Sequence, residues 1–227
     1  MKDISWHKRV ASYLWDIHIE SCSSEYNPDL HVLLSKGRYQ LVTDRAIYSH
    51  EDLYDNFSEV LLEKLDLKSP EMNKVLVLGL GLGSIPIILD QLKVGAWDIT
   101  AVEIDEVICE LAFDYAYPKI NSKMDTIVAD AYQFVQHCKD HFDLICVDLF
   151  VGEHTPQKFR SNKFLGTLKG LLSDDGVIVY NTLAFTKKDK QQSEDFFKRT
   201  FQKVFDEAEM IYAHKNYMLI SNSRWFS

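Results

Sequence analysis

The sequence has few cysteines and no long uninterrupted apolar segment. Its four cysteines, Cys22, Cys109, Cys138 and Cys146, form no CxxC pair and have no zinc-ligand spacing. We therefore expect reduced thiols in a cytoplasmic protein and no disulfide framework. The first ten residues carry no apolar signal core, and glycines interrupt the longest apolar stretch, so we expect no membrane span. An HExxH motif, a P-loop and a Ser/His/Asp order are also absent, and no metal site is predicted.

Positive charge is in deficit. Lys and Arg number 25 against 34 Asp and Glu, which gives a net charge of −9 at pH 7. This balance argues against nucleic acid as an obligatory partner and suits a neutral or cationic small molecule. The chain has 227 residues, of which 46% are hydrophobic. That is enough for one large domain, with or without a small appendage.

Glycine is sparse, but it is concentrated at one place. Of nine glycines, three lie within residues 75–83, which read VLVLGLGLG. The Val- and Leu-rich start of this run is typical of a strand covered on both faces in a parallel sheet. Residues 84–93 then favour a helix, with Pro86 in its first turn. Strand, glycine turn and helix begin a nucleotide-binding βαβ unit. A tight turn beneath a closely packed helix explains the glycines equally well.

The next strand supports the nucleotide-binding interpretation. Glu103 ends the apolar run 99–102 and follows the last glycine at about the 20-residue spacing of a ribose-binding acid. A carboxylate there can accept hydrogen bonds from both ribose hydroxyls. The alternative is a solvated charge at the end of a strand. Asp105 is predicted to cap the following helix, residues 106–117, which stops before Pro118.

The first fifty residues predict a small antiparallel β unit, because they contain short alternating or apolar runs separated by turn residues. Its strands are expected at residues 15–20, 31–34, 38–43 and 46–48. A short helix is expected before it, near residues 4–14. After it, the spacing of Ser49 and Asp52 resembles a capping box and opens a packing helix over residues 49–67.

The rest of the chain alternates between strands and helices. Further strands are predicted at residues 126–128, 142–147, 177–180, 209–213 and 217–221. Further helices are predicted from Ala131 to about His137, over residues 161–172 and over residues 186–201. The last of these begins with a capping box of Thr186 and Asp189. Residues 174–176 are predicted as a turn. This order favours an α/β fold with a doubly wound, mostly parallel seven-stranded sheet. We expect residues 1–50 to form the small β unit and residues 51–227 the nucleotide-binding domain.

Polar side chains follow the predicted parallel strands at their carboxyl ends, where ligands bind in such sheets. They are the glycine turn, Glu103, Asp130, Asp148 and Asn181. Five segments follow one another over residues 74–221: VLVLGLGLG, AVEID, VADA, FDLICVDLF and DDGVIVYNT. Their order resembles that of class I S-adenosylmethionine-dependent methyltransferases. The resemblance implies that Gly79, Gly81 and Gly83 line the donor and that Glu103 holds its ribose. It also implies that Asp130, followed by Ala131, meets the adenine amino group.

Within that fold the chain resembles spermidine synthases, the polyamine aminopropyltransferases. The features that carry this are the small N-terminal β unit, Gln40 in GRYQL, the run from Tyr48 to Glu51, VEID, and the long loop after Asp148. The resemblance implies an acceptor side closed by Gln40 and Tyr48. Glu153 and His154 in the loop either contact the acceptor or are solvated, and Tyr48 is equally explained by core packing.

Two positions depart from the spermidine synthases. Leu82 stands where the family has an aspartate in the glycine loop, and Val151 stands where it has a second aspartate three residues after Asp148. The first change removes a carboxylate that repels the carboxylate of intact S-adenosylmethionine. The second removes the base that the family is expected to use on its amine. Asp148 remains as the candidate base, or alternatively as a partner of loop backbone.

Together these features predict a transferase that binds S-adenosylmethionine, or its decarboxylated form, and transfers its methyl group to a small acceptor such as an amine. An aminopropyltransferase and a catalytically silent ligand-binding relative are the alternatives within the family. A nicotinamide-dependent dehydrogenase is the rival outside it, because it shares the first βαβ unit. A homodimer is left open.

Overall fold

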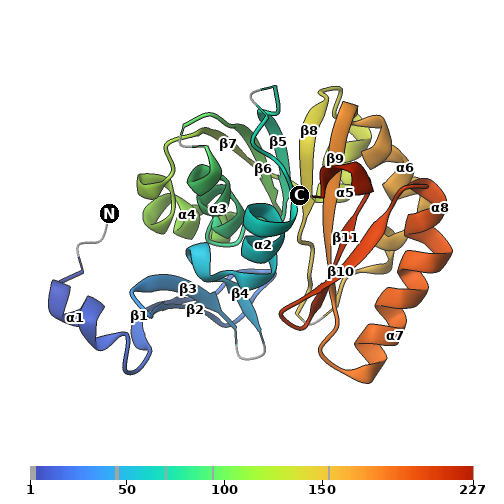
Figure 1. The fold of residues 1–227 in the computed structure, drawn as a ribbon. Coiled ribbons are helices and arrows are strands. Elements are labelled where there is room, and N and C mark those ends of the chain that lie inside the picture. The colour runs from blue at the N-terminus through green and yellow to red at the C-terminus, as the bar shows by residue number, and fades with distance from the viewer. Residues whose placement is uncertain (1–3, 44–45, 70, 94, 153, 227) are drawn as a thin grey trace.

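The computed structural model describes residues 4–43, 46–69, 71–93, 95–152 and 154–226, which form two β-sheets (Figure 1). The first is a four-stranded antiparallel sheet in sequence order, with β1 at Ile17–Cys22, β2 at Leu30–Ser35, β3 at Arg38–Val42 and β4 at Ile47–Ser49. The predicted antiparallel β unit is therefore confirmed. The division of the chain into two domains at residue 50 stays a prediction.

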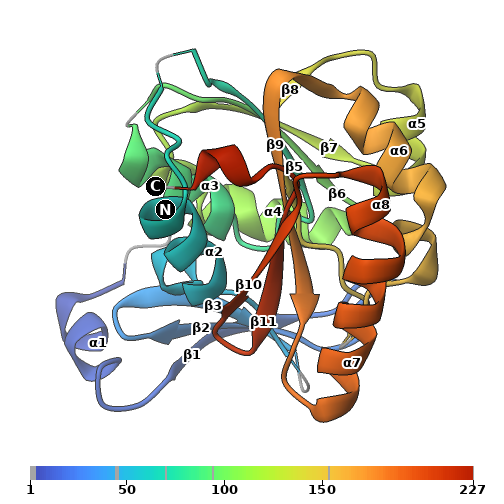
Figure 2. The same cartoon turned by 45° about the vertical axis from the view of Figure 1, so that its right-hand side comes forward.

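The second sheet has seven strands in the order β10-β11-β9-β8-β5-β6-β7. Their bounds are β5 Lys74–Leu78, β6 Asp98–Glu103, β7 Lys123–Val128, β8 Phe142–Val147, β9 Leu172–Leu183, β10 Glu209–Ala213 and β11 Asn216–Ile220. Strands β5 to β9 pair in parallel, whereas β11 is antiparallel to both β9 and β10. Figure 2 shows this closing hairpin beside β9. The predicted mostly parallel, doubly wound sheet is confirmed.

Helices cover both faces of this sheet because alternate strand residues point to opposite sides. One core joins residues such as Val75 and Val77 to α2 (Asp55–Glu59), α3 (Ser84–Leu92) and α4 (Glu106–Tyr115). The other joins Leu76 and Leu78 to the helices of the opposite face. Those helices are α5 Ala131–His137, α6 Asn162–Gly170, α7 Lys187–Phe196 and α8 Gln202–Val204, with a π-helical segment Phe197–Phe201 between the last two.

The four-stranded sheet packs against the start of the nucleotide-binding unit. Tyr39 and its apolar neighbours on β2 and β3 share a buried cluster with Leu82 of the glycine turn and with Ile108, Leu111 and Tyr115 of α4. Burying such side chains is worth about 1.5–3 kcal/mol each. This apolar contact therefore fixes the first sheet directly beside the glycine turn.

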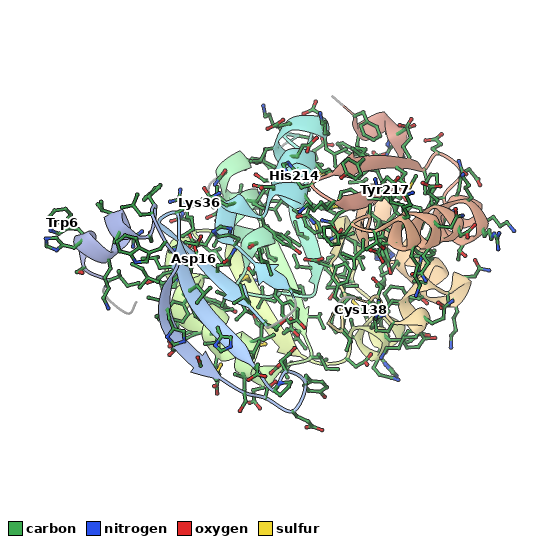
Figure 3. The ribbon with its side chains drawn as sticks, turned by 90° about the horizontal axis from the view of Figure 1, so that it is seen from below. Trp6, Asp16, Lys36, Cys138, His214 and Tyr217 are labelled. Atoms are coloured by element: carbon green, nitrogen blue, oxygen red, sulfur yellow. The ribbon has the colours of Figure 1, made fainter. Side chains whose placement is uncertain are left out.

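The N-terminal helix α1, Trp6–Ala11, projects away from both sheets and has no buried residue. In Figure 3 Trp6 lies at the outer tip of the molecule, where 68% of its surface is exposed. Within the described ranges, no helix is long and apolar enough to cross a membrane. Short 3-10 helices complete the fold at Glu51–Leu53, Tyr117–Lys119, Gln157–Arg160 and Ser223–Trp225.

The predicted helix over residues 49–67 is wrong in its start and its regularity. The Ser49 hydroxyl bonds to the Ser84 hydroxyl (2.7 Å), and Asp52 pairs with Arg38, so neither side chain caps a helix. The α-helix begins only at Asp55 and passes into a π-helical segment at Val60–Lys64. Long-range partners have replaced the local capping box.

Strand β9 is longer than predicted. Its pairing with β8 jumps from Phe142↔Leu172 to Leu144↔Val177, so the expected turn at residues 174–176 is an irregularity inside the strand. Gly176 is needed there, because a Cβ would lie 2.8 Å from the Phe142 carbonyl oxygen. By contrast, the capping box of Thr186 and Asp189 forms as predicted.

Candidate functional site

The site lies where the order of the parallel strands reverses. β5 lies between β6 and β8, and the chain runs from β5 to β6 on one side and from β8 to β9 on the other. Helices that leave β5 and β8 on opposite faces open a crevice at such a point. The carboxyl ends of these strands bring together the glycine turn, Glu103, Asp148 and Asn181.

All three glycines of the turn have left-handed backbone angles, with φ values of +91°, +53° and +75° at Gly79, Gly81 and Gly83. A Cβ on Gly79 would lie 2.1 Å from the Asp148 carbonyl oxygen. On Gly81 it would lie 3.1 Å from the Ser49 Cβ, and on Gly83 3.0 Å from the Ala116 Cβ. The glycines therefore let the turn pack closely against β8, the first sheet and the end of α4. Their role as donor-lining residues stays a prediction.

Glu103 is not a freely solvated strand-end charge. Its Oε2 accepts hydrogen bonds from the backbone N–H groups of Leu80 (3.0 Å) and Gly81 (3.4 Å). Its Oε1 accepts from those of Ile104 (2.9 Å) and Asp105 (3.2 Å). Burial raises the pKa of Glu103, and these N–H groups oppose the rise. The carboxylate thus holds the glycine turn against β6, and the long bond to Gly81 leaves it capacity for a ligand hydroxyl.

Asp105 caps α4 as predicted, since its carboxylate accepts from the Val107 N–H (3.1 Å). The same side chain also accepts from Ser24 (2.5 Å) and from Asn27 (2.7 Å). It thereby ties the loop between β1 and β2 to the strand end. Sequence spacing could predict the cap, but it gave no sign of these two partners.

Asp130 starts α5, where its Oδ1 accepts from the N–H groups of Tyr132 (2.8 Å) and Gln133 (3.2 Å). Its Oδ2 accepts from the Lys158 ammonium (2.5 Å). Burial acts to raise the pKa of Asp130, but the bond from Lys158 and the helix N–H groups outweigh it and the net shift is downward. Ala131 is buried, at 5% exposure, in the core beneath α5. A ligand amino group would share Asp130 with Lys158.

Asp148 follows β8, at the carboxyl ends of the parallel strands. Its Oδ1 accepts from the Asn181 amide (2.8 Å), and its Oδ2 accepts from the Tyr54 hydroxyl (2.9 Å). Burial raises the pKa of Asp148 to about 6, although both hydrogen bonds oppose the rise. Its recorded partners are thus side chains, in place of the loop backbone that the sequence left as an alternative. Tyr54 was missed, because it lies in a segment expected only to pack.

Asn181 also carries a buried side-chain oxygen that receives no hydrogen bond from the described residues. Its side chain is 1% exposed, and its Oδ1 has no hydrogen-bond partner among the described residues. Buried polar atoms almost always have partners, so this exception beside a titratable carboxyl makes Asn181 a candidate site residue. The sequence named Asn181 only as a polar strand end.

The residues predicted on the acceptor side lie on neighbouring strands of the first sheet, Gln40 on β3 and Tyr48 on β4. Gln40 is buried in the first sheet, where its amide contacts the His50 ring at 3.3 Å. Tyr48 is half-buried; it donates to Asn27 (3.0 Å), and burial raises its pKa beside the charges of Glu103 and Asp105. The acceptor roles of both residues stay predictions.

The two positions that depart from the spermidine synthase pattern lie in different segments, Val151 in the loop after Asp148 and Leu82 in the glycine turn. Val151 is 67% exposed, and its backbone pairs with that of His154. Glu153 lies outside the described residues. Leu82 is only 1% exposed and belongs to the apolar cluster under the first sheet. Its side chain therefore packs into that cluster, and its effect on donor choice stays a prediction.

Comparison with known proteins gives consistent results. The spermine/spermidine synthase domain model matches residues 55–220. A polyamine aminopropyltransferase of Vibrio vulnificus is 33% identical over 146 residues, 62% of this chain and 46% of the relative. An N-terminal histidine N-methyltransferase of Emericella nidulans is 34% identical over 114 residues, 48% of this chain and 20% of that protein. The chain thus spans less than half the length of these two relatives.

The fold is also similar to solved structures. A spermidine synthase in complex with the transition state analogue AdoDATO superposes with a TM-score of 0.68 and 17% identity. The superposition covers 91% of this chain and 72% of that structure. Because the match to the domain model begins only at residue 55, it does not extend to Gln40 and Tyr48.

Proposed function

The chain belongs to the spermine/spermidine synthase domain family. From that premise we propose that it is a transferase with an S-adenosylmethionine-type donor, and that it moves the donor's methyl group to a small acceptor. The donor would lie across the carboxyl ends of β5 and β6. The donor supplies an activated carbon bound to a sulfonium. The chain itself must orient the two substrates and take up a proton.

The observation that carries the proposal is the environment of Asp148. A pKa of about 6 leaves this carboxylate mostly ionised at neutral pH and still able to accept a proton. The Asn181 amide and the Tyr54 hydroxyl hold both of its oxygens in place. An amine or hydroxyl acceptor that reaches Asp148 can give up its proton there.

The donor-side residues fit a nucleoside. Glu103 ends β6 and Asp130 follows the neighbouring parallel strand β7, which supports a role for the first carboxylate toward ribose hydroxyls and for the second toward an adenine amino group. Glu103 contributes through an oxygen that has one long backbone bond. Asp130 contributes through the oxygen that Lys158 now occupies, so Lys158 exchanges partners or shares when the base binds.

Methyl transfer is favoured over aminopropyl transfer by the side chains that are missing. With Val151 exposed and Leu82 buried in an apolar cluster, neither position places a carboxylate at the crevice. At Val151 the chain thereby lacks the base that the family is expected to use on its amine, and this absence disfavours aminopropyl transfer. Aminopropyl transfer is the second candidate, since the Vibrio vulnificus relative is a polyamine aminopropyltransferase.

The decisive experiment is an acceptor screen with two labelled donors, one labelled on the methyl group of S-adenosylmethionine and one on the aminopropyl group of its decarboxylated form. We expect methyl transfer that falls by about 100-fold or more in Asp148→Asn. Aminopropyl transfer alone would establish the second candidate. Titration with S-adenosylhomocysteine and with NAD accompanies the screen. Binding of the nucleoside without any transfer would indicate a silent ligand-binding relative, and binding of NAD alone would refute the proposal.

A further inference from the structure

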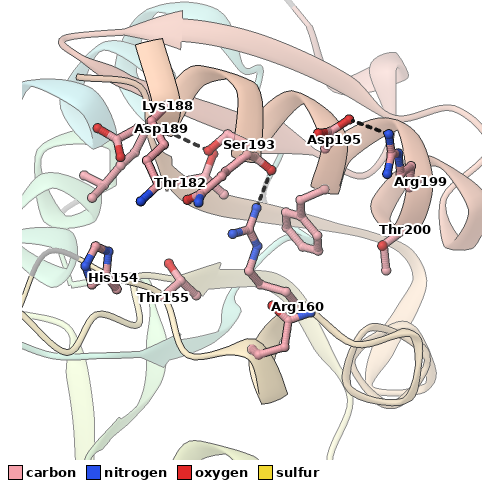
Figure 4. A pocket seen from close by; sticks show the side chains of 14 residues that line it. His154, Thr155, Arg160, Thr182, Lys188, Asp189, Ser193, Asp195, Arg199 and Thr200 are labelled. Atoms are coloured by element: carbon pink, nitrogen blue, oxygen red, sulfur yellow. Dashed lines mark hydrogen bonds and ion pairs between the residues drawn. The ribbon is translucent and has the colours of Figure 1, made fainter. Parts of the chain in front are cut away.

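The segment Gln157–Arg160, a 3-10 helix between β8 and α6, is fixed to the body of the protein. The Tyr180 hydroxyl donates to the Phe159 carbonyl (3.1 Å), and the Phe159 side chain is buried in the core on this face of the sheet. Arg160 donates to a backbone carbonyl of α7 (2.5 Å), and Figure 4 shows its side chain extending toward that helix. The backbone that carries Lys158 is therefore held in place.

The ammonium of Lys158 reaches Asp130 at the start of α5. Its Nζ lies 2.5 Å from the Asp130 Oδ2, with 45% of the lysine side chain and 26% of the aspartate side chain exposed. The other oxygen of Asp130, Oδ1, already accepts from the N–H groups of Tyr132 and Gln133. Both oxygens of Asp130 are thus engaged, one by its own helix and one by a cation from another segment.

An adenine amino group would need the oxygen that Lys158 holds. Oδ1 of Asp130 is committed to the first turn of α5, where two N–H groups require an acceptor. Oδ2 bonds to the lysine, which is not part of that helix. A hydrogen bond that involves ionised groups is roughly twice as strong as one between neutral groups, and the amino group of adenine is a neutral donor. Lys158 is therefore a competitor that the base must displace or tolerate.

We propose that Lys158 is an autoinhibitory contact of the donor site: it holds the oxygen of Asp130 that an adenine amino group would use, and it thereby lowers the affinity for the donor. The inference rests on the proposed function, because it concerns the regulation of the donor site proposed there. A partly exposed ion pair of this kind shifts a binding equilibrium by up to about fivefold. Salt screens such charges, so the affinity for a neutral adenine nucleoside should rise with ionic strength.

The test is calorimetric titration of the intact chain and its variants with S-adenosylhomocysteine. We expect Lys158→Gln to bind it about two- to fivefold more tightly than the wild type, because the competitor of the amino group is removed. Lys158→Arg keeps the positive charge and should stay close to the wild type. Lys163→Gln is the matched control, since it removes an equal charge from an exposed position at the start of α6, and it should leave the affinity unchanged.

Two comparisons assign the effect to the amino group of the base. Adenosine and purine riboside differ by that group alone, and displacement of S-adenosylhomocysteine measures the affinity of both. Lys158→Gln should strengthen adenosine binding and leave purine riboside binding unchanged. In an Asp130→Asn background, where the asparagine can still cap α5, Lys158→Gln should have no effect. The adenosine affinity of the wild type should rise with added salt, whereas that of Lys158→Gln should not.

Three outcomes would overturn the inference. They are unchanged or weaker S-adenosylhomocysteine binding in Lys158→Gln, a gain that persists in the Asp130→Asn background, and an equal gain for purine riboside. Should Lys158→Gln fail to fold, the wild type decides the matter, because an adenosine affinity that falls or stays constant with added salt also overturns the inference.

The same samples separate this inference from the proposed function. S-adenosylhomocysteine binding by the wild type without a gain in Lys158→Gln refutes only the autoinhibitory contact. A gain in binding without any transfer in the acceptor screen leaves the contact standing and refutes only the transferase. Absence of S-adenosylhomocysteine binding from both proteins refutes the donor site, and the inference with it.

Discussion

Asp148→Asn should change the pH dependence of stability while keeping the local structure. In the wild type, Asp148 accepts one hydrogen bond from the Asn181 amide and one from the Tyr54 hydroxyl. An asparagine can keep its oxygen toward Asn181 and turn its NH₂ toward Tyr54, because a tyrosine hydroxyl can accept as well as donate. The substitution is nearly equal in volume. It therefore removes the charge and little else.

The size of the effect follows from the raised pKa. Folding moves the pKa of Asp148 from 3.8 to about 6, and each pKa unit corresponds to about 1.4 kcal/mol. Between these two pH values the unfolded chain has lost the proton and the folded chain keeps it, so folding stability falls as pH rises. The total loss is about 3 kcal/mol, of which roughly 1.4 kcal/mol falls between about pH 5 and pH 8. Asp148→Asn has no titratable carboxyl at this position and therefore avoids this loss of stability.

The assay is urea unfolding of both proteins at several pH values between about 5 and 8, with the free energy of unfolding extrapolated to water. We expect the stability of the variant relative to wild type to increase with pH by the amount above and to level off beyond pH 7. Asp143→Asn is the matched control at the start of the same strand. The Ser173 hydroxyl and two backbone N–H groups outweigh burial and lower the pKa of Asp143, so its contribution is lost only at acid pH and the control should stay flat. A flat difference for Asp148→Asn as well would refute the reasoning.

Three further predictions concern the crevice. Glu103→Ala should weaken S-adenosylhomocysteine binding by about 3 kcal/mol, because it removes two charge-assisted hydrogen bonds. Asp130→Ala should weaken binding by about 1.5 kcal/mol, because it removes one such bond. Equal and negligible losses in calorimetry would place the site elsewhere. Gly79→Ala should lower the free energy of unfolding by about 3 kcal/mol, because its Cβ would lie 2.1 Å from a carbonyl oxygen. At Gly166 a Cβ would meet no atom within 4 Å, so Gly166→Ala should raise the free energy of unfolding by up to about 1 kcal/mol. Leu82→Asp should lower the free energy of unfolding by about 4 kcal/mol in urea, since it buries a charge in an apolar cluster. It should not switch donor preference. A stable variant with a switched donor preference would contradict this prediction.

The fold could be predicted from the sequence because its main signals are local. The apolar runs at β5, β6 and β8 are covered on both faces, and the periodicity of such strands is visible without knowing their neighbours. The capping box at Thr186 formed between partners only three residues apart. The similar spacing at Ser49 did not cap a helix, because Ser84, 35 residues away, takes its hydroxyl. Local rules fail where a long-range contact offers a better partner.

The candidate site could be predicted only in part, for the same reason. Strand order places residues at the carboxyl ends, so Glu103, Asp148 and Asn181 could be named from the sequence. Tyr54 could not, because it is 94 residues from Asp148 and meets it only through the packing of α2 on the sheet. The ion pair of Asp130 with Lys158 is likewise a contact across a loop.

Donor choice shows how side-chain direction changes a conclusion drawn from alignment. In the glycine turn, the left-handed angles at Gly81 and Gly83 send the residue between them, Leu82, into the cluster with Tyr115 and the first sheet. A leucine at this position, 1% exposed, carries no charge that could repel or attract a donor tail. Selectivity between intact and decarboxylated donors must therefore rest on the charges that do face the crevice. Of these, Asp148 changes charge near neutral pH, so the preference for a cationic tail should itself rise as the pH passes through about 6.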